Sequence, residues 1–230
     1  MNEKIIIALD VSSPQKAIEL VHELHDLAGM FKVGSQLFMC GGREIVLEII
    51  RNRGKVFLDL KFHDIPNTVT HAALEAARLG VSMMTIHASG GRAMMQAVPK
   101  ELHEKLGARR PIVVAVTVLT SFDTRALFEV GVERPLDEQV HRLALFAQEC
   151  GIDGVVCSPR EIQLVRKAVN PNFKIVTPGI RMPEQSMNDQ QRIATPHDAL
   201  AAGADYIVVG RAVTDDRDPR AALQRLVASI

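Results

Sequence analysis

One short segment of this sequence concentrates side chains that can transfer protons. Residues 56–64 read Val-Phe-Leu-Asp-Leu-Lys-Phe-His-Asp, so that Asp59, Lys61 and Asp64 interrupt or follow an apolar, strand-like run. Because side chains alternate across a β-strand, Asp59 and Lys61 should project from one face and Leu60 from the other. Charges at the end of a buried strand cost free energy unless they have partners. The pattern therefore predicts a charged site.

Charged residues also mark the two strand-like runs that precede this segment. Asp10 follows the first run and Lys32 lies in the second, which predicts an alternating Lys–Asp–Lys–Asp cluster of Lys32, Asp59, Lys61 and Asp64. In such a cluster each group stabilises the charged form of its neighbours. Lys61 is then available as an acid, whereas Schiff-base chemistry needs a neutral lysine. A purely structural salt-bridge network is the alternative, although apolar residues would often serve stability as well.

Two glycine–arginine segments near the C-terminus are typical of anion binding. Residues 177–181 read Thr-Pro-Gly-Ile-Arg, and residues 209–211 read Val-Gly-Arg. A glycine lets the backbone approach an anion closely, and an arginine can bind phosphate oxygens in a bidentate manner. If these segments follow strands 7 and 8 of a barrel, they occupy the usual phosphate-binding position. The sequence therefore predicts a phosphate site that includes Arg181, Gly210 and Arg211.

The elements that must position these residues alternate regularly. Short runs rich in Val and Ile, expected as strands, begin near Ile5, Phe31, Val56, Met83, Ile112, Gly154, Lys174 and Tyr206. Amphipathic segments expected as helices include residues 14–27, 44–51, 67–79, 136–149 and 219–227. Strict alternation implies parallel strands with right-handed crossovers. We therefore predict an α/β fold in which residues 1–230 form a single-domain (β/α)8 TIM barrel.

The main alternative fold is a doubly wound open sheet. That fold usually carries a glycine-rich phosphate loop after its first strand. Here residues 10–14 read Asp-Val-Ser-Ser-Pro, without glycine. The two longest stretches without periodicity, residues 120–135 and 179–196, follow the fifth and seventh expected strands. In a barrel both would lie at the C-terminal face, where active sites are built.

The element boundaries are also legible in the sequence. Ser13 before Pro14 and Asp218 before Pro219 are expected to cap helices. Gly80, Gly151 and Gly203 each stand where a helix should end in a left-handed residue before the next strand.

Composition excludes several classes of protein. The chain has 27 Lys and Arg against 27 Asp and Glu, 4% aromatic residues and no Trp, which argues against nucleic-acid binding. The sequence contains no run of 18 or more apolar residues, which argues against a membrane span. No signal-peptide pattern follows Met1. The three cysteines and eight histidines lack metal-ligand spacing. We expect a cytoplasmic protein without a bound metal.

The segment Asp59-Leu60-Lys61-Phe62-His63-Asp64-Ile65-Pro66-Asn67-Thr68 resembles the Asp-x-Lys-x-x-Asp signature of the orotidine 5'-phosphate decarboxylase family. Leu9-Asp10, Lys32-Val33-Gly34, Leu119-Thr120-Ser121 and both glycine–arginine segments are similar to that family as well. The resemblance implies conversion of orotidine 5'-monophosphate to uridine 5'-monophosphate and CO2 in de novo pyrimidine synthesis. It also implies a homodimer that uses no metal or organic cofactor.

The resemblance assigns a role to each matching position. Lys61 would protonate the pyrimidine carbon that loses its carboxylate, Asp59 would lie beside that carboxylate, and Lys32 and Asp64 would complete the catalytic group. Asp64 and Thr68 would come from the partner subunit. The full substrate-binding set implied is Asp10, Lys32, Asp59, Lys61, Asp64, Ile65, Thr68, Thr120, Ser121, Arg181, Gln190, Gly210 and Arg211. Within it, Thr120 and Ser121 would contact the base, and Gln190 would join the phosphate-binding residues from a closing loop.

Two other functions stay open at this stage. The same barrel superfamily contains magnesium-dependent sugar-phosphate decarboxylases and aldolases that share Asp-x-Lys-x-x-Asp. In them a carboxylate stands at the position of Lys32, and a cation there opposes magnesium binding. The second alternative is a phosphate-ligand binding barrel without catalysis. A decayed enzyme should lose costly charges first, yet all four charged residues are present.

Overall fold

Eight parallel strands close into a barrel, in which each strand pairs with its neighbours in chain order and β8 pairs with β1. The structure is a computed structural model and describes residues 2–181 and 194–230. The strands are β1 (Ile5–Ala8), β2 (Met30–Gly34), β3 (Val56–Phe62), β4 (Met83–His87), β5 (Ile112–Val116), β6 (Gly154–Val156), β7 (Lys174–Thr177) and β8 (Tyr206–Val209). The predicted (β/α)8 barrel is confirmed, because an open sheet would leave two unpaired edges.

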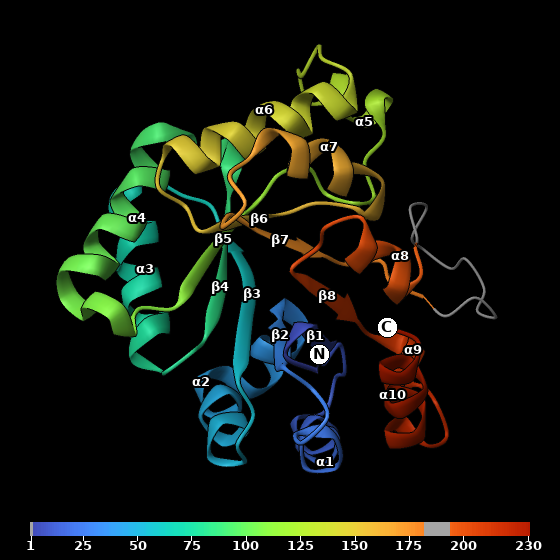
Figure 1. The fold of residues 1–230 in the computed structure, drawn as a ribbon. Helices are drawn as coiled ribbons and strands as arrows, with labels where there is room; N and C mark the ends of the chain where they lie inside the picture. The colour runs from blue at the N-terminus through green and yellow to red at the C-terminus, as the bar shows by residue number, and fades with distance from the viewer. Residues whose placement is uncertain (1, 182–193) are drawn as a thin grey trace.

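Helices surround the strands and cover their outer face (Figure 1). They are α1 (Pro14–Leu24), α2 (Ser35–Arg51), α3 (Pro66–Arg78), α4 (Gly91–Leu106), α5 (Thr124–Glu129), α6 (Leu136–Glu149), α7 (Ile162–Ala168), α8 (Pro196–Ala201), α9 (Arg211–Thr214) and α10 (Pro219–Ala228). Within the described residues, no helix combines the length and the apolar character needed to span a bilayer.

Most expected boundaries agree with the structure, and the exceptions have local causes. The second strand begins at Met30 rather than Phe31, and the helix expected at 44–51 is the second part of α2. Gly42 has φ 57° and ψ −150° inside α2, so the backbone leaves helical geometry there. This irregular residue hides the first part of the helix from a search for periodicity. The stretch 120–135, expected to be irregular, contains the short helix α5.

The predicted helix ends are confirmed. The Ser13 hydroxyl accepts a hydrogen bond from the Lys16 N–H at 3.3 Å, and the Asp218 carboxylate accepts one from the Ala221 N–H at 2.8 Å. Gly80, Gly151 and Gly203 have φ values of 88°, 80° and 111°. Only glycine adopts this left-handed region readily, which explains why these three helix-to-strand connections each carry one.

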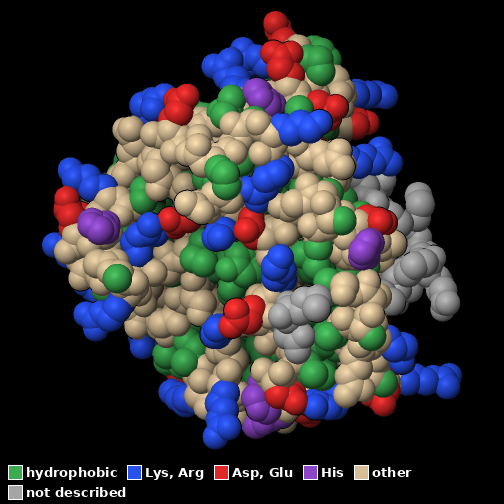
Figure 2. Space-filling view, viewed as in Figure 1, with side chains coloured by type: hydrophobic (Ala, Val, Ile, Leu, Met, Phe, Trp, Pro, Cys, Tyr) green, Lys and Arg blue, Asp and Glu red, His purple; other side chains and the backbone are tan. Residues whose placement is uncertain are grey.

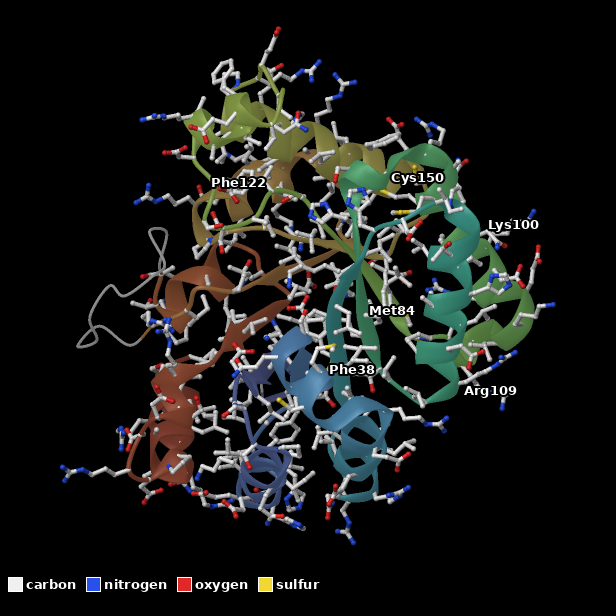
Figure 3. The ribbon with its side chains drawn as sticks, turned by 180° about the vertical axis from the view of Figure 1, so that it is seen from behind. Phe38, Met84, Lys100, Arg109, Phe122 and Cys150 are labelled. Carbon is white, nitrogen blue, oxygen red and sulfur yellow. The ribbon has the colours of Figure 1, made fainter. Side chains whose placement is uncertain are left out.

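The core has two apolar layers separated by the strands. The inner layer fills the barrel with Ile6, Ala8, Met30, Phe57, Met83, Val114, Val176 and Val208. The outer layer, which includes Ile5 and Ile7, packs between strands and helices. Met84 belongs to this outer layer and lies on a barrel strand, whereas Lys100 and Arg109 lie at the molecular edge (Figure 3). Apolar residues therefore occupy both faces of the strands, and the barrel interior is packed rather than open.

An ion pair fastens neighbouring strands at the N-terminal end of the barrel. The two Asp153 oxygens accept hydrogen bonds from Arg110 at 2.6 and 2.7 Å, and Oδ2 also accepts the Val113 N–H at 2.8 Å. The hydrogen bond to Asp153 raises the pKa of Arg110 above its ordinary value. This end of a barrel serves stability, while the opposite end carries the chemistry.

Candidate active site

A cavity of about 410 Å³ opens at the C-terminal ends of the strands. Its floor is apolar, because Ala8, Phe57, Val176 and Val208 of the inner core layer also line it. The charged residues that line it are Asp10, Lys32, Asp59, Lys61, Arg181 and Arg211. Acidic and basic side chains gather around apolar atoms near the middle of the face in Figure 2. An apolar floor with a few charged groups and this volume suits a small-molecule ligand.

Lys32 joins two carboxylates across three neighbouring strands. Its Nζ lies 2.7 Å from Asp10 Oδ1 and 3.9 Å from Asp59 Oδ2. The Lys32 and Asp59 side chains are only 12% and 14% exposed, so each charge needs the other for compensation. The parallel register brings them together, because β1 pairs with β2 at Lys32 and β2 pairs with β3 at Asp59.

Lys61 continues this network toward the open cavity. Its Nζ lies 2.9 Å from Asp59 Oδ1, and its side chain is 39% exposed, which leaves the ammonium accessible to a ligand. Asp59 and Lys61 line the same cavity as expected, but regular alternation is not the cause. Lys61 has a φ of 52°, and the β3–β4 register shifts between Leu58 and Phe62. A left-handed residue other than glycine costs about 1 kcal/mol, and such strain is frequent at functional sites.

Thr85 on β4 contacts both of these residues and was not expected from the sequence. Its side chain is fully buried. The hydroxyl accepts the Lys61 N–H at 2.8 Å and donates to Asp59 Oδ1 at 3.0 Å. The available signal was a single hydroxyl residue in the apolar strand Met-Met-Thr-Ile-His, but threonine is common in strands and gives little warning.

Two stacked histidines lie beside the lysine. The rings of His63 and His87 stack with centroids 5.1 Å apart, and the Ser89 hydroxyl hydrogen-bonds with His87 Nδ1 at 2.8 Å. Burial lowers the pKa of His87 below its ordinary value, and the charges of His63 and Lys61 lower it further. The neutral ring is therefore the favoured form of His87 next to the ammonium.

The predicted anion-binding segments meet in the same cavity. Gly179, Arg181, Gly210 and Arg211 all line it, and Arg181 is buried. Gly179 has a φ of 82°, a conformation that lets the chain turn before Arg181. Thr120 lines the cavity from the chain that follows β5. The fold thus brings one pair of arginines and one pair of lysines to the same cavity.

Other expected site residues lie outside this cavity lining. Asp64, Ile65, Thr68 and Ser121 are exposed, and none of them lines the cavity. Of the four-member cluster expected from the sequence, a single chain brings together Lys32, Asp59 and Lys61, and among the described residues no ion pair includes Asp64. Its Oδ1 instead accepts the Ile65 N–H at 2.6 Å, because the chain leaves β3 after Lys61 and starts α3 at Pro66. Gln190 lies outside the described residues.

Apolar residues form the rest of the lining. They are Val116, Val118, Leu119, Val156 and Pro178. The three valines carry no signal in the sequence, because valine is an ordinary strand residue. In the part of the chain that the structure describes, no group of three His, Cys, Asp or Glu side chains is arranged to hold a metal ion.

Known proteins are similar to this chain in sequence and fold. Residues 3–226 match the model of the orotidine 5'-phosphate decarboxylase / HUMPS family. Orotidine 5'-phosphate decarboxylases of Syntrophotalea carbinolica and Moorella thermoacetica are 51% and 50% identical, with 98% and 99% of this chain and 93% and 92% of theirs covered. The orotidine 5'-phosphate decarboxylase structure from Lactobacillus acidophilus has a TM-score of 0.85 and 37% identity, and 97% of each chain is covered. The chain therefore belongs to the orotidine 5'-phosphate decarboxylase / HUMPS family.

Proposed function

We propose that this chain decarboxylates orotidine 5'-monophosphate to uridine 5'-monophosphate and CO2 in de novo pyrimidine synthesis. The observation that carries the proposal is the chain of ion pairs from Asp10 through Lys32 and Asp59 to Lys61 in one cavity. The similarity along nearly the whole chain to proteins named orotidine 5'-phosphate decarboxylase supports the proposal. Residues 1–230 act as one catalytic domain.

The substrate's phosphate binds at the arginine side of the cavity. Arg181, Gly210 and Arg211 contact it together with Gln190, while Asp10, Lys32 and Thr68 contact the ribose. Thr120, Ser121 and Ile65 complete the surroundings of the base. The location of Arg181 and Arg211 in the same cavity as Lys61 supports this arrangement. Phosphate lies far from the reacting carbon, and its binding energy holds the substrate's carboxylate against the charged network.

Lys61 is the acid of the reaction. When the bond to the carboxylate breaks, its electron pair stays on a ring carbon that cannot easily delocalise it, and CO2 leaves. The Lys61 ammonium stabilises this carbanion and then donates a proton to the carbon. The neutral amine recovers a proton from solvent. Asp59 repels the substrate's carboxylate in the ground state and loses that repulsion when neutral CO2 forms, a smaller contribution than that of preorganised Lys61.

The reaction uses no metal or organic cofactor. Lys32 supports this part of the proposal, since its ammonium lies between the carboxylates of Asp10 and Asp59. A magnesium ion needs anionic oxygen ligands, and here a fixed cation already compensates them. The magnesium-dependent sugar-phosphate chemistry of related barrels would require a carboxylate at this position.

The enzyme is a cytoplasmic homodimer in which each subunit completes the site of the other. Asp64 and Thr68 are the residues that reach the partner's cavity. Their exposure in a single chain supports this, and so does the 65% exposure of Ile65 between them.

The experiment that tests the proposal is an assay with orotidine 5'-monophosphate in excess chelator, followed by the loss of orotate absorbance. We expect full activity in chelator. Loss of activity that added magnesium restores would favour the metal-dependent reaction instead. Tight nucleotide binding without turnover, with or without magnesium, would favour a binding barrel.

A further inference from the structure

We propose that Thr85 is a positioning residue for the decarboxylation. Its buried hydroxyl fixes the Asp59 carboxylate and, through that carboxylate, the ammonium of Lys61. Thr85 does not line the cavity, so it acts through its neighbours and not on the substrate. This inference rests on the proposed function, because Lys61 and Asp59 are its reacting groups.

The hydrogen bonds around Thr85 can run in only one direction. The backbone N–H of Lys61 is a donor, so the Thr85 oxygen must accept at 2.8 Å. The hydroxyl proton is then left for Asp59 Oδ1 at 3.0 Å, an oxygen that only accepts when the carboxylate is ionised. A hydroxyl has one proton, so both partners together define its orientation.

This bond determines which carboxylate oxygen faces which lysine. Asp59 Oδ1 accepts from Thr85 and from Lys61 Nζ at 2.9 Å, while Oδ2 faces Lys32 at 3.9 Å. The terminal torsion of an aspartate is broad and is not fixed by the side chain itself. The Thr85 hydroxyl supplies a buried, uncharged restraint on that torsion. Without it, the carboxylate can rotate between the two lysines and carry the Lys61 ammonium with it.

Thr85 also holds the irregular backbone at Lys61. Leu58 pairs with Met84 and Phe62 pairs with Ile86, so three residues of β3, 59–61, stand opposite Thr85 alone. Lys61 has its left-handed φ at this point, where its N–H is bound by the threonine side chain. One hydroxyl therefore fixes the lysine at its backbone and, through Asp59, at its ammonium.

The test compares Thr85→Val, which keeps the shape and removes the hydroxyl, with Thr85→Ser, which keeps the hydroxyl. Thr117→Val is the matched control: Thr117 is also buried, and its hydroxyl donates to the Val156 carbonyl at 2.9 Å. We expect Thr85→Val to lower kcat roughly 10- to 100-fold, the scale of a misplaced reacting group, with KM changed less than about threefold. Thr85→Ser should restore most of the activity, and Thr117→Val should keep it.

A double-mutant cycle tests whether Thr85 acts through Asp59. In an Asp59→Ala background, Thr85→Val should lower kcat clearly less than it does in the wild-type chain, because the carboxylate it positions is gone and only its bond to the Lys61 N–H remains. An undiminished effect of Thr85→Val in that background would overturn the assignment. So would wild-type kcat in Thr85→Val, or the same loss in Thr85→Ser.

Two further outcomes are decisive. If Thr85→Val does not fold, Thr85→Cys replaces it, since a thiol fits the space and donates weakly, and the same loss of kcat is expected. If the wild-type chain itself does not decarboxylate the nucleotide, the proposed function fails and this assignment fails with it. An active wild type with an equally active Thr85→Val variant contradicts only the assignment.

Discussion

Lys61 and Asp59 are two residues apart on β3 and form a 2.9 Å ion pair, although the backbone between them has left regular strand geometry. A regular strand would also place both side chains on one face. The left-handed conformation of Lys61 adds a bend to the backbone, and the Lys61 N–H at this bend donates a hydrogen bond to the Thr85 hydroxyl. The fold therefore orients the ammonium before any ligand enters.

The proposal that two subunits share each site can be tested by mixing two inactive variants. Lys61→Ala and Asp64→Asn homodimers should each be nearly inactive, because every site carries one lesion. After subunit exchange, roughly half of the dimers are mixed, and one of their two sites carries neither lesion. We therefore expect activity to recover to about one quarter of the wild-type value, measured as initial rates before and after exchange.

The control for this experiment is proof of exchange by mass spectrometry of differently labelled subunits. Recovery that fails despite proven exchange would place Asp64 in the site of its own chain. That result would contradict the proposal that Asp64, which is exposed and outside the described ion pairs of its own chain, completes the partner's site.

Phosphate recognition by Arg181 can be separated from chemistry with a truncated substrate. A charge-assisted hydrogen bond contributes about 1.5–3 kcal/mol, so Arg181→Ala should lower kcat/KM for orotidine 5'-monophosphate roughly 10- to 100-fold per bond lost. With orotidine, which lacks the phosphate, the same variant should react almost like the wild type. Equal losses with both substrates would assign Arg181 to the barrel structure instead. Arg225→Ala, on α10 outside the cavity, is the control.

The Arg110–Asp153 pair should affect stability and not catalysis. Asp153→Ala removes the carboxylate that accepts hydrogen bonds from both Arg110 and the Val113 N–H. The side chains of Arg110 and Asp153 are only about a quarter exposed. We expect the free energy of unfolding to fall by about 2–3 kcal/mol in urea titrations, with kcat unchanged. Glu129→Ala breaks the exposed pair with Arg125 and should change little. A loss of kcat without a loss of stability would contradict this division between the two ends of the barrel.

His87 should make stability depend on pH in the mildly acidic range. Its pKa is lowered from an ordinary 6.5, mainly by burial, so the unfolded chain binds the proton more readily than the folded chain. The stability that the neutral ring provides is complete above about pH 6.5 and is lost as the pH falls toward the folded pKa. Unfolding free energies should therefore fall more steeply on acidification in wild type than in His87→Gln. Parallel curves would contradict the prediction, and His197→Gln, at an exposed position on α8, is the control.

The sequence predicted the barrel because every level of the pattern agreed. Strand positions, glycine helix ends and the capping residues Ser13 and Asp218 all pointed to the same alternation. The charged cavity lining was also predictable, because Asp10, Lys32 and Lys61 are conspicuous at the ends of apolar strands. Burying charged groups costs free energy, and these residues stand out because the sequence shows no structural gain that would compensate for that cost.

The missed features depend on three-dimensional contacts that no local pattern encodes. Thr85 is an ordinary strand residue until the register shift of β3 places it against Lys61 and Asp59. Asp64 follows the bend at Lys61 and lies outside the ion pairs that the structure describes within one chain. A regular period predicts the face of a side chain only as long as the backbone remains regular.

The most direct test of the role of Lys61 is the turnover of orotidine 5'-monophosphate by Lys61→Ala, measured in the presence of chelator. Calorimetry with uridine 5'-monophosphate measures in parallel whether the variant still binds the nucleotide. We expect the variant to bind the product nucleotide while kcat falls at least about 10⁴-fold, because the proton donor and the charge beside the carbanion are both removed. Turnover within about tenfold of wild type, with nucleotide binding intact, would contradict the role of Lys61.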